Sequence, residues 1–296
     1  MDKIKNDKYL ALAAFIALGC IWGSNFLYMR LAAHYISPIQ VVFLRVVLAT
    51  IPIVAFGFAR KAFKKWHFKY WYHFLVMSLL AAVIYYYCFV MGSHLLYSGI
   101  AGSISGSTPL FSFILGLIFL KEEKSSALKI LGLIIGMLGI ILLAKPFNAA
   151  ITATTWEGVL YMIIGSISFG ASFIYAKKYV SPLQISGLAL ASYQLVGASI
   201  ILLILTPFHG ILNILQDKTA TIGLILGLSV LGTGLAFLMY YFIIDKMGAV
   251  KAASVAYIAP IVALVVGATL GKEPIGWLDI AGVLLILFGV YILKKK

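Results

Sequence analysis

Apolar residues fill almost the whole chain and are grouped into long segments. Ten stretches of about 20 residues follow one another with short connectors between them, and about 20 residues is the length of helix that crosses about 30 Å of hydrocarbon. Of the 296 residues, 63% are apolar and 11% are charged, against about 45–50% and about 25% in soluble domains. The pattern predicts an all-α polytopic membrane protein with ten transmembrane helices. The expected spans are residues 9–29, 37–58, 70–92, 97–120, 126–144, 156–176, 183–206, 220–244, 250–271 and 276–293.

The basic residues lie mostly on one side of the predicted membrane. With the N-terminus placed inside, 18 of the 23 Lys and Arg residues fall on the inner side, 4 fall on the outer side, and Arg45 alone falls in the middle of a span. Because cytoplasmic loops hold the excess of positive charge, both chain ends are expected in the cytoplasm. This topology, together with anionic lipid on the cytoplasmic face, accounts for the net charge of +14, so a nucleic-acid partner is not expected.

The second half of the chain repeats the first. The segment SISGSTPLFSFILGLIFLKE, from Ser103, returns 151 residues later as SVAYIAPIVALVVGATLGKE, from Ser254. Each copy covers five spans, so the expected units are residues 1–148 and 149–296. Because five is odd, the second unit enters the membrane from the opposite side, and inverted repeats of this kind are typical of secondary transporters. The matched pairs include Pro109 with Pro260, Gly116 with Gly267, Lys121 and Glu122 with Lys272 and Glu273, and Arg30 with Lys177.

Two sets of residues carry a resemblance to a known family. The segment IWGSNFLYMRLAAHYISPIQVVFLR and the P…G…KE close of the fourth and ninth spans resemble the drug/metabolite transporter superfamily, and within it the ten-helix EamA-type branch. The resemblance covers nearly the whole chain. It implies transport of small metabolites, often amino-acid export, through a cavity between the halves. It also implies that the fifth and tenth spans stand apart as a scaffold.

The functional hypothesis combines the repeat with this resemblance. We expect a secondary transporter in the inner membrane of a prokaryote that moves a small polar or zwitterionic metabolite, such as an amino acid, by alternating access. Export is the expected direction. One alternative is uptake or facilitated diffusion of a cationic or aromatic metabolite held in a tyrosine-lined cage. A channel or a membrane receptor is an alternative of another class, and neither would need inverted halves.

Arg45 is the ninth residue of the second predicted span and lies near mid-depth. A charged side chain there costs about 2.5–3.5 kcal/mol on insertion scales, so it is expected to face a cavity or a partner. Its planar guanidinium is suited to clamp a carboxylate or phosphate of a substrate. A structural tether to helix-end carbonyls is the alternative. The second repeat has Ala189 at the matching position, so only one half carries the charge.

Further polar and aromatic side chains lie at mid-depth or follow helical spacing. Interfacial belts place tyrosines at span ends, so tyrosines in the middle of spans are expected to line a cavity where their hydroxyls find partners. Small and polar residues in one stripe belong at helix contacts or at water, and helix packing is favoured for the serines. The candidates for substrate binding besides Arg45 are Trp22, Asn25, Tyr85, Tyr86, Ser103, Ser172, Tyr175, Tyr193, Gln194, Tyr240 and Tyr257.

Prolines interrupt the fourth and ninth spans at matching positions. A proline removes one backbone hydrogen bond, and the freed carbonyl is tolerated at mid-depth only where protein or water satisfies it. Gly106, Pro109 and Pro260 are therefore expected to mark two broken helices that contribute to a gate or a site. A static kink shaped for packing is the alternative.

Acidic and catalytic groups are scarce in the predicted spans. Glu273 and Asp279, like the other carboxylates, fall at span ends, which does not favour a proton relay. The sequence has no P-loop, no HExxH and no histidine cluster, so enzyme activity, a cofactor and a metal are not expected. The expected partners are a small-molecule substrate and the bilayer. Glycines 132, 136 and 139 form a strip that favours helix packing or a homodimer.

Overall fold

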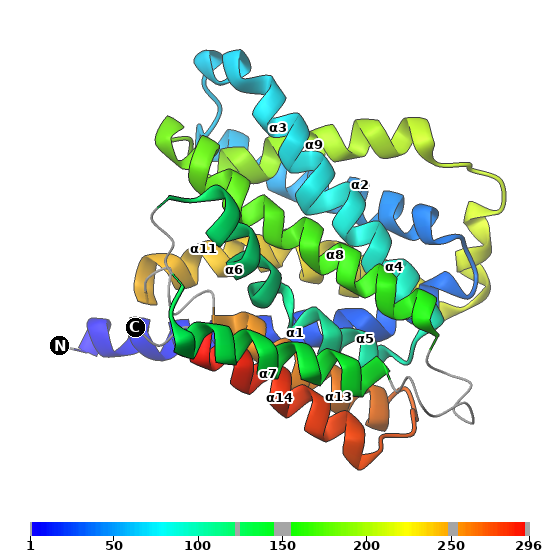
Figure 1. Cartoon of the computed structure of the whole chain (residues 1–296). Helices are drawn as coiled ribbons and strands as arrows, with labels where there is room; N and C mark the ends of the chain where they lie inside the picture. The colour runs from blue at the N-terminus through cyan, green and yellow to red at the C-terminus, as the bar shows by residue number, and fades with distance from the viewer. Residues whose placement is uncertain (1, 122–124, 145–154, 248–253, 294–296) are drawn as a thin grey trace.

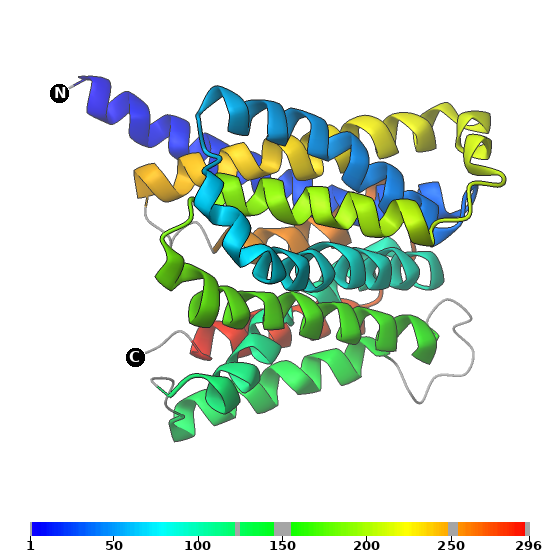
Figure 2. The same ribbon diagram turned by 90° about the horizontal axis from the view of Figure 1, so that it is seen from above.

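The computed structural model describes residues 2–121, 125–144, 155–247 and 254–293, and its spans are helical. Figures 1 and 2 show a helical bundle in which the first helix begins and the last helix ends at the same end, as an even number of crossings requires. We call this end the inner end and the opposite one the outer end. Within the described ranges, eight helical segments are long and apolar enough to cross a membrane, and two shorter apolar helices follow them. The architecture is therefore the expected polytopic one.

The first half of the chain supplies five of these crossings. Its third span includes a 3₁₀ turn and a π-helical turn, and its fourth span is divided into two helices. The elements are α1 (Asp2–Ala33), α2 (Pro38–Ala59), η1 (Lys65–Tyr70), α3 (Trp71–Ser78), η2 (Leu79–Val83), α4 (Ile84–Leu95), α5 (Ser98–Ser105), α6 (Thr108–Phe119) and α7 (Ala127–Ala144).

The second half follows the same order. The eighth span of the chain contains a long π-helix, and the described part of the ninth span begins with a 3₁₀ turn. Residues 250–253, which belong to the predicted ninth span, lie outside the described ranges. The elements are α8 (Trp156–Tyr175), η3 (Ala176–Val180), η4 (Ser181–Leu183), α9 (Gly187–Leu205), η5 (Ile211–Gln216), α10 (Lys218–Ile222), η6 (Gly223–Leu235), α11 (Ala236–Met247), η7 (Ser254–Tyr257), α13 (Ile258–Thr269) and α14 (Trp277–Leu293).

The packing of the helices repeats with the roles of the two halves exchanged. In one direction α1 packs against η6, α11 and α13 of the second half. In the other direction its counterpart α8 packs against α4 and α6 of the first half. The pairs α2 with α9 and α7 with α14 join equivalent helices. This pattern is that of two inverted halves that interlock around a shared centre.

Helices α7 and α14 form a pair along one edge of the bundle (Figure 1). A Cβ atom at Gly139 would lie 2.7 Å from the carbonyl oxygen of Gly282, and one at Gly132 would lie 2.8 Å from that of Gly289. The glycine strip therefore brings two helices of the same chain together, as small residues do in membranes. Dimerisation stays a prediction, and the glycine strip of α7 is already covered by α14 of the same chain.

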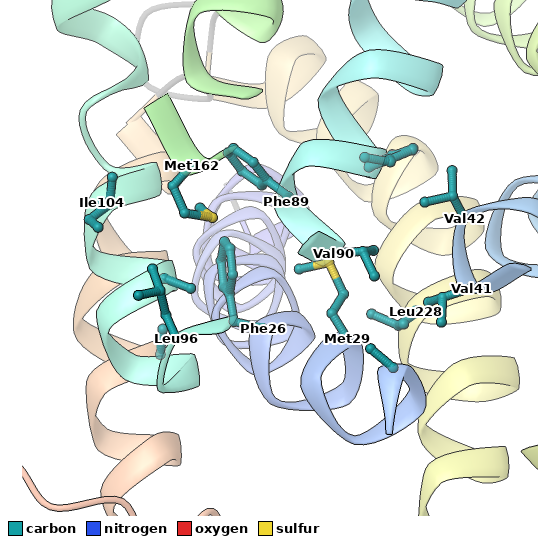
Figure 3. Close-up of a cluster of buried hydrophobic side chains, with 14 of the residues drawn as sticks. Phe26, Met29, Val41, Val42, Phe89, Val90, Leu96, Ile104, Met162 and Leu228 are labelled. Carbon is teal, nitrogen blue, oxygen red and sulfur yellow. The ribbon is translucent and has the colours of Figure 1, made fainter. Parts of the chain in front are cut away.

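The centre of the bundle is closed by apolar side chains from both halves. Figure 3 shows Phe26 and Met29 of α1 beside Phe89 of α4, Met162 of α8 and Leu228 of η6, all of them buried. Many large apolar side chains on the outside are exposed, as expected where acyl chains replace water.

Candidate functional site

Arg45 is buried between helices of both halves and is 3% exposed. Its guanidinium carbon lies 4.0 Å from the ring centroid of Tyr86 on α4, which is a cation–π contact. Its Nε donates to Thr233 Oγ1 on η6 at 3.1 Å, and its Nη1 lies 3.6 Å from the sulfur of Met29 on α1. Within the described residues it has no carboxylate partner. The charge is held by a ring, a hydroxyl and a thioether, which are weaker partners than a carboxylate.

The π-helix η6 brings a second polar group beside Arg45. Asn25 of α1 is 4% exposed and packs on Gly232, where a Cβ atom would lie 2.5 Å from Asn25 Oδ1. Gly232 directly precedes Thr233, so the Asn25 amide and the Arg45 guanidinium approach consecutive residues of η6. Within the described residues Asn25 Oδ1 has no hydrogen-bond partner. A buried amide oxygen without a donor is an uncommon and costly arrangement.

The widened turn of η6 also explains how α1 approaches so closely. Tyr28 lies between two glycines of η6, because a Cβ atom at Gly223 would meet its ring at 2.6 Å and one at Gly227 at 2.5 Å. The hydroxyl of Thr233 donates to Leu228 O, five residues earlier, at 3.0 Å. A π-helix exposes carbonyls at this spacing, and π-helical turns are frequent at functional sites.

Aromatic side chains form one wall beside Arg45. Tyr85 stacks on Phe169 of α8, with ring centroids 4.2 Å apart and planes at 11°. The Tyr85 ring also lies 4.6 Å from the rings of Tyr86 and Phe89. This wall joins α4 of the first half to α8 of the second. The cluster of Asn25, Arg45, Tyr85, Tyr86, Phe169 and Thr233 is called the Arg45 site below.

The groups of the Arg45 site are chemically complementary to a zwitterion. The guanidinium offers paired N–H donors to a carboxylate, and Asn25 Oδ1 offers an acceptor to an ammonium group. The aromatic wall offers an apolar surface to a side chain. Arg45, Asn25 and Tyr86 are all buried, so the site is closed in this structure.

A separate pocket of about 250 Å³ opens toward the inner end of the bundle. Pro109 and Ser112 of α6 line it, together with Lys177 and Tyr257. Ser112 in the wall of this pocket packs on Gly170 of α8, where a Cβ atom would lie 2.9 Å from Ser112 Oγ. The residue before Gly170 is Phe169, which stacks on Tyr85. The aromatic pair therefore lies next to the pocket wall on one side and Arg45 on the other.

The two interrupted spans meet each other. Helix α5 ends at Ser105 and α6 begins at Thr108, so Pro109 lies in the first turn of a new helix rather than inside one. Pro260 lies in the first turn of α13, directly after the 3₁₀ turn η7. A Cβ atom at Gly106 would lie 2.7 Å from Pro260 Cγ, so the two interruptions pack against each other. Their role in gating stays a prediction.

The predicted serines bond to their own helices. Ser103 Oγ donates to Gly99 O at 2.6 Å, and Ser172 Oγ donates to Phe169 O at 2.6 Å. Both side chains are almost fully buried. Hydroxyls that bond back to the backbone are common in helices and do not present a donor to a substrate. This geometry favours the packing interpretation for both.

Two predicted tyrosines lie near the inner ends of their spans and outside the Arg45 site. The hydroxyl of Tyr175 lies 2.7 Å from His73 Nδ1, and that of Tyr193 lies 3.0 Å from His67 Nδ1. Tyr193 is the seventh of the 19 residues of α9, and its ring contacts Phe63 and Phe68 close to the inner end of the bundle.

The remaining candidates are divided between other contacts. Trp22 of α1 and Tyr240 of α11 pack with ring centroids 6.0 Å apart in a second apolar cluster. Gln194 is buried in α9, and Tyr257 lines the inner pocket. Of the predicted residues, the structure gathers Arg45, Asn25, Tyr85 and Tyr86 into one site. Within the described residues, no three His, Cys, Asp or Glu side chains gather as metal ligands would.

Several residues of the site were not predicted from the sequence. Thr233 and Phe169 had no distinguishing feature, since a threonine in an apolar run and a phenylalanine in a span are both ordinary in membranes. Two of the carboxylates predicted at span ends are buried, with Glu273 6% and Asp279 1% exposed. Asp279 Oδ2 accepts from Gly276 N at 2.8 Å, at the start of α14. Glu273 is paired with Arg30.

Fold and site together define a polytopic membrane protein built as two inverted halves around a buried polar site. The model of the EamA-like transporter family matches residues 9–145 and again residues 156–294, and the chain belongs to this family. The chain is similar to the "Uncharacterized inner membrane transporter YedA" of Escherichia coli strain K12, with 26% identity over 96% of this chain and 92% of that protein. It is also similar to an "Uncharacterized transporter" of Archaeoglobus fulgidus, with 25% identity over 98% of this chain and 99% of that protein.

A solved crystal structure matches the fold over nearly its whole length. The match has a TM-score of 0.62 and covers 97% of this chain and 96% of the other, at 18% identity. At this identity the likeness concerns the fold alone. The family is one of membrane transporters.

Proposed function

We propose that the protein is a secondary transporter of a small zwitterionic metabolite, with an α-amino acid as the substrate class. It would work by alternating access in the inner membrane of a prokaryote, with export as the direction. The observation that carries the proposal is the pair formed by Arg45, which has no carboxylate partner among the described residues, and Asn25, whose Oδ1 has no donor there.

A substrate carboxylate would replace weaker partners of Arg45. A bidentate carboxylate supplies charge-assisted bonds that are stronger than a bond to a hydroxyl or a thioether. The amino group of the same substrate would donate to Asn25 Oδ1. The substrate side chain would lie on the wall of Tyr85 and Phe169, whose rings stack at 4.2 Å. One ligand of this class would therefore satisfy both buried groups.

The closed state of the site supports alternating access rather than a pore. Both polar groups are sealed from the two ends of the bundle, so a substrate reaches them only when the halves move. The aromatic-cage alternative is less favoured, because Arg45 already lies 4.0 Å from the centroid of Tyr86 and would repel a second cation.

Counterflow in proteoliposomes tests the proposal. Vesicles are loaded with an unlabelled amino acid and diluted into a trace of the same labelled compound, one amino acid at a time. A carrier accumulates the label transiently above the outside concentration, whereas a channel only equilibrates it. Accumulation of at least one amino acid is expected. Failure of all twenty to accumulate, with accumulation of quaternary amines instead, would support the cationic alternative and contradict the proposal.

A further inference from the structure

One carboxylate joins three elements at the outer end of the bundle. Glu273 follows α13, and its Oε1 forms an ion pair with Arg30 Nη1 of α1. The same Oε1 accepts from Ser98 N at 2.8 Å, and Oε2 accepts from Gly99 N at 2.9 Å. These two amides open helix α5, which a carboxylate stabilises through both hydrogen bonding and the helix dipole. Glu273, Arg30 and the two amides are called the outer bolt below.

The backbone after α13 is shaped to deliver this carboxylate. Lys272 has a φ of 51°, in the left-handed region that non-glycine residues rarely occupy. The chain thereby turns back, and Glu273 N donates to Gly267 O at 2.9 Å. Gly267 has no side chain at the place where the Glu273 carboxylate passes, and a Cβ atom there would also lie 3.0 Å from Gly99 N. Any larger residue would occupy the position of the bolt.

The described residues at the equivalent place of the inner end line a pocket. By the sequence repeat, Gly116 corresponds to Gly267 and Lys177 corresponds to Arg30. Both Gly116 and Lys177 line the inner pocket of about 250 Å³. Glu122, the counterpart of Glu273, lies outside the described residues. Among the described residues the related positions differ: the Glu273 carboxylate contacts the outer ones, and the inner ones line a pocket.

We propose that Glu273 is the gating residue of the outer side, and that its bolt holds the passage shut on that side while the inner side is open. The bolt spans the seam along which the halves separate, because α1 and α5 belong to the first half and Glu273 follows α13 of the second (Figure 1). When the outer side opens, Glu273 leaves the Ser98 and Gly99 amides and is hydrated. The inference assumes a carrier, as proposed above, but it makes no use of the substrate class.

The burial of the two partners fits a contact that opens and closes. The Glu273 side chain is 2% exposed, whereas that of Arg30 is 25% exposed and reaches solvent. Removing the carboxylate therefore leaves no sealed charge behind, and the variant is expected to fold. Loss of the bolt lowers the free energy of the outer-open state relative to this one and shifts the population toward it.

Cysteine accessibility in whole cells and inverted vesicles tests the gate without any substrate. Cys20→Ser and Cys88→Ala give a background free of thiols, into which Ser103→Cys or Ser112→Cys is introduced. Ser103 is buried beneath the outer bolt, and Ser112 lines the inner pocket. In the Glu273→Gln variant a membrane-impermeant thiol reagent is expected to label position 103 from outside about tenfold faster and position 112 from inside more slowly.

The expected changes in labelling rate, faster at position 103 and slower at position 112, distinguish a gating effect from a general loosening of the fold. A variant that merely loosens the fold labels faster at both positions, and that result would overturn the proposal, as would an unchanged rate at position 103. Gly267→Ala is a second variant that displaces the carboxylate without changing charge, and it is expected to act in the same direction. Gly276→Ala is its matched control, because its Cβ atom would have no neighbour closer than 3.6 Å.

Discussion

Arg45 carries its charge at a depth where a charged side chain costs about 2.5–3.5 kcal/mol on insertion scales. Its contacts with Tyr86, Thr233 and Met29 offset part of this cost but leave its strongest kind of partner, a carboxylate, unused. A purely structural arginine would be expected to bond helix-end carbonyls or an acid. The contacts therefore favour the clamp over the tether.

Replacing Arg45 with lysine is expected to lower transport at least about tenfold, because an ammonium keeps the charge but loses the bidentate fork. Initial rates of counterflow in proteoliposomes measure the effect. Arg60→Lys is the matched control, because Arg60 is exposed at the inner end of α2 and its replacement is expected to leave the rate unchanged. Equal transport rates for the two variants would show that Arg45 does not bind the substrate.

Replacing Asn25 with alanine is expected to weaken the recognition of the amino group selectively. Competition assays compare an amino acid with its analogue that lacks the α-amino group. The native protein is expected to prefer the amino acid by about tenfold, the effect of one hydrogen bond to a charged group, and Asn25→Ala is expected to lose this preference. A preference that survives the substitution would show that another group accepts from the ammonium.

At the scale of elements, the π-helix η6 is the feature that makes room for the site. Three of its four glycines, at positions 223, 227 and 232, let α1 approach, and the Asn25 amide packs directly on Gly232. Thr233 follows at once and contacts Arg45. The register of η6 against α1 therefore sets the distance between the two polar groups.

Gly232→Ala is expected to abolish transport, because its Cβ atom would lie 2.5 Å from Asn25 Oδ1 and 2.6 Å from Gly227 O and would displace both the amide and the η6 backbone. Gly234→Ala is the matched control on the same helix, where the nearest atom is Pro52 Cγ at 3.3 Å. Counterflow is measured for both after equal yields are confirmed by gel filtration. Full activity in Gly232→Ala would contradict the assigned position of Asn25.

The α7–α14 pair is expected to contribute stability rather than specificity. Gly139→Val would overpack a contact in which a Cβ atom already lies 2.7 Å from Gly282 O, and it is expected to lower the thermal midpoint in detergent by about 5 °C. Ile134→Val on the lipid-facing side of α7, where the side chain is 51% exposed, is expected to leave the midpoint unchanged. Equal midpoints would mean that the pair is not held by this strip.

At the scale of the whole molecule, the sequence was sufficient for the spans and for the inverted halves. Segment length, apolar content and the 151-residue repeat are each averaged over many residues, so one atypical residue does not change the predicted span. The ends of elements were less accurate: the third span, predicted at residues 70–92, extends from Lys65 to Leu95. Those details depend on tertiary contacts that periodicity does not record.

The site was only partly predictable for the same reason. Arg45 is conspicuous because a charge in a span is rare, and Asn25 because it follows a polar stripe. Tyr193 and Tyr175 were equally conspicuous, yet they pair with histidines near the inner end. Glu273 was passed over because a carboxylate at a span end is ordinary, and only the three-dimensional contacts with Arg30 and α5 reveal its position.

The most direct test of the central claim asks whether the Arg45 site is reached from both sides of the membrane. In the thiol-free background, Thr233→Cys places one thiol beside Arg45. An impermeant reagent applied to cells and, separately, to inverted vesicles is expected to label it from either side, and the transported amino acid is expected to protect it in both cases. Labelling from one side only, with no protection, would contradict a site shared by two alternately opening halves.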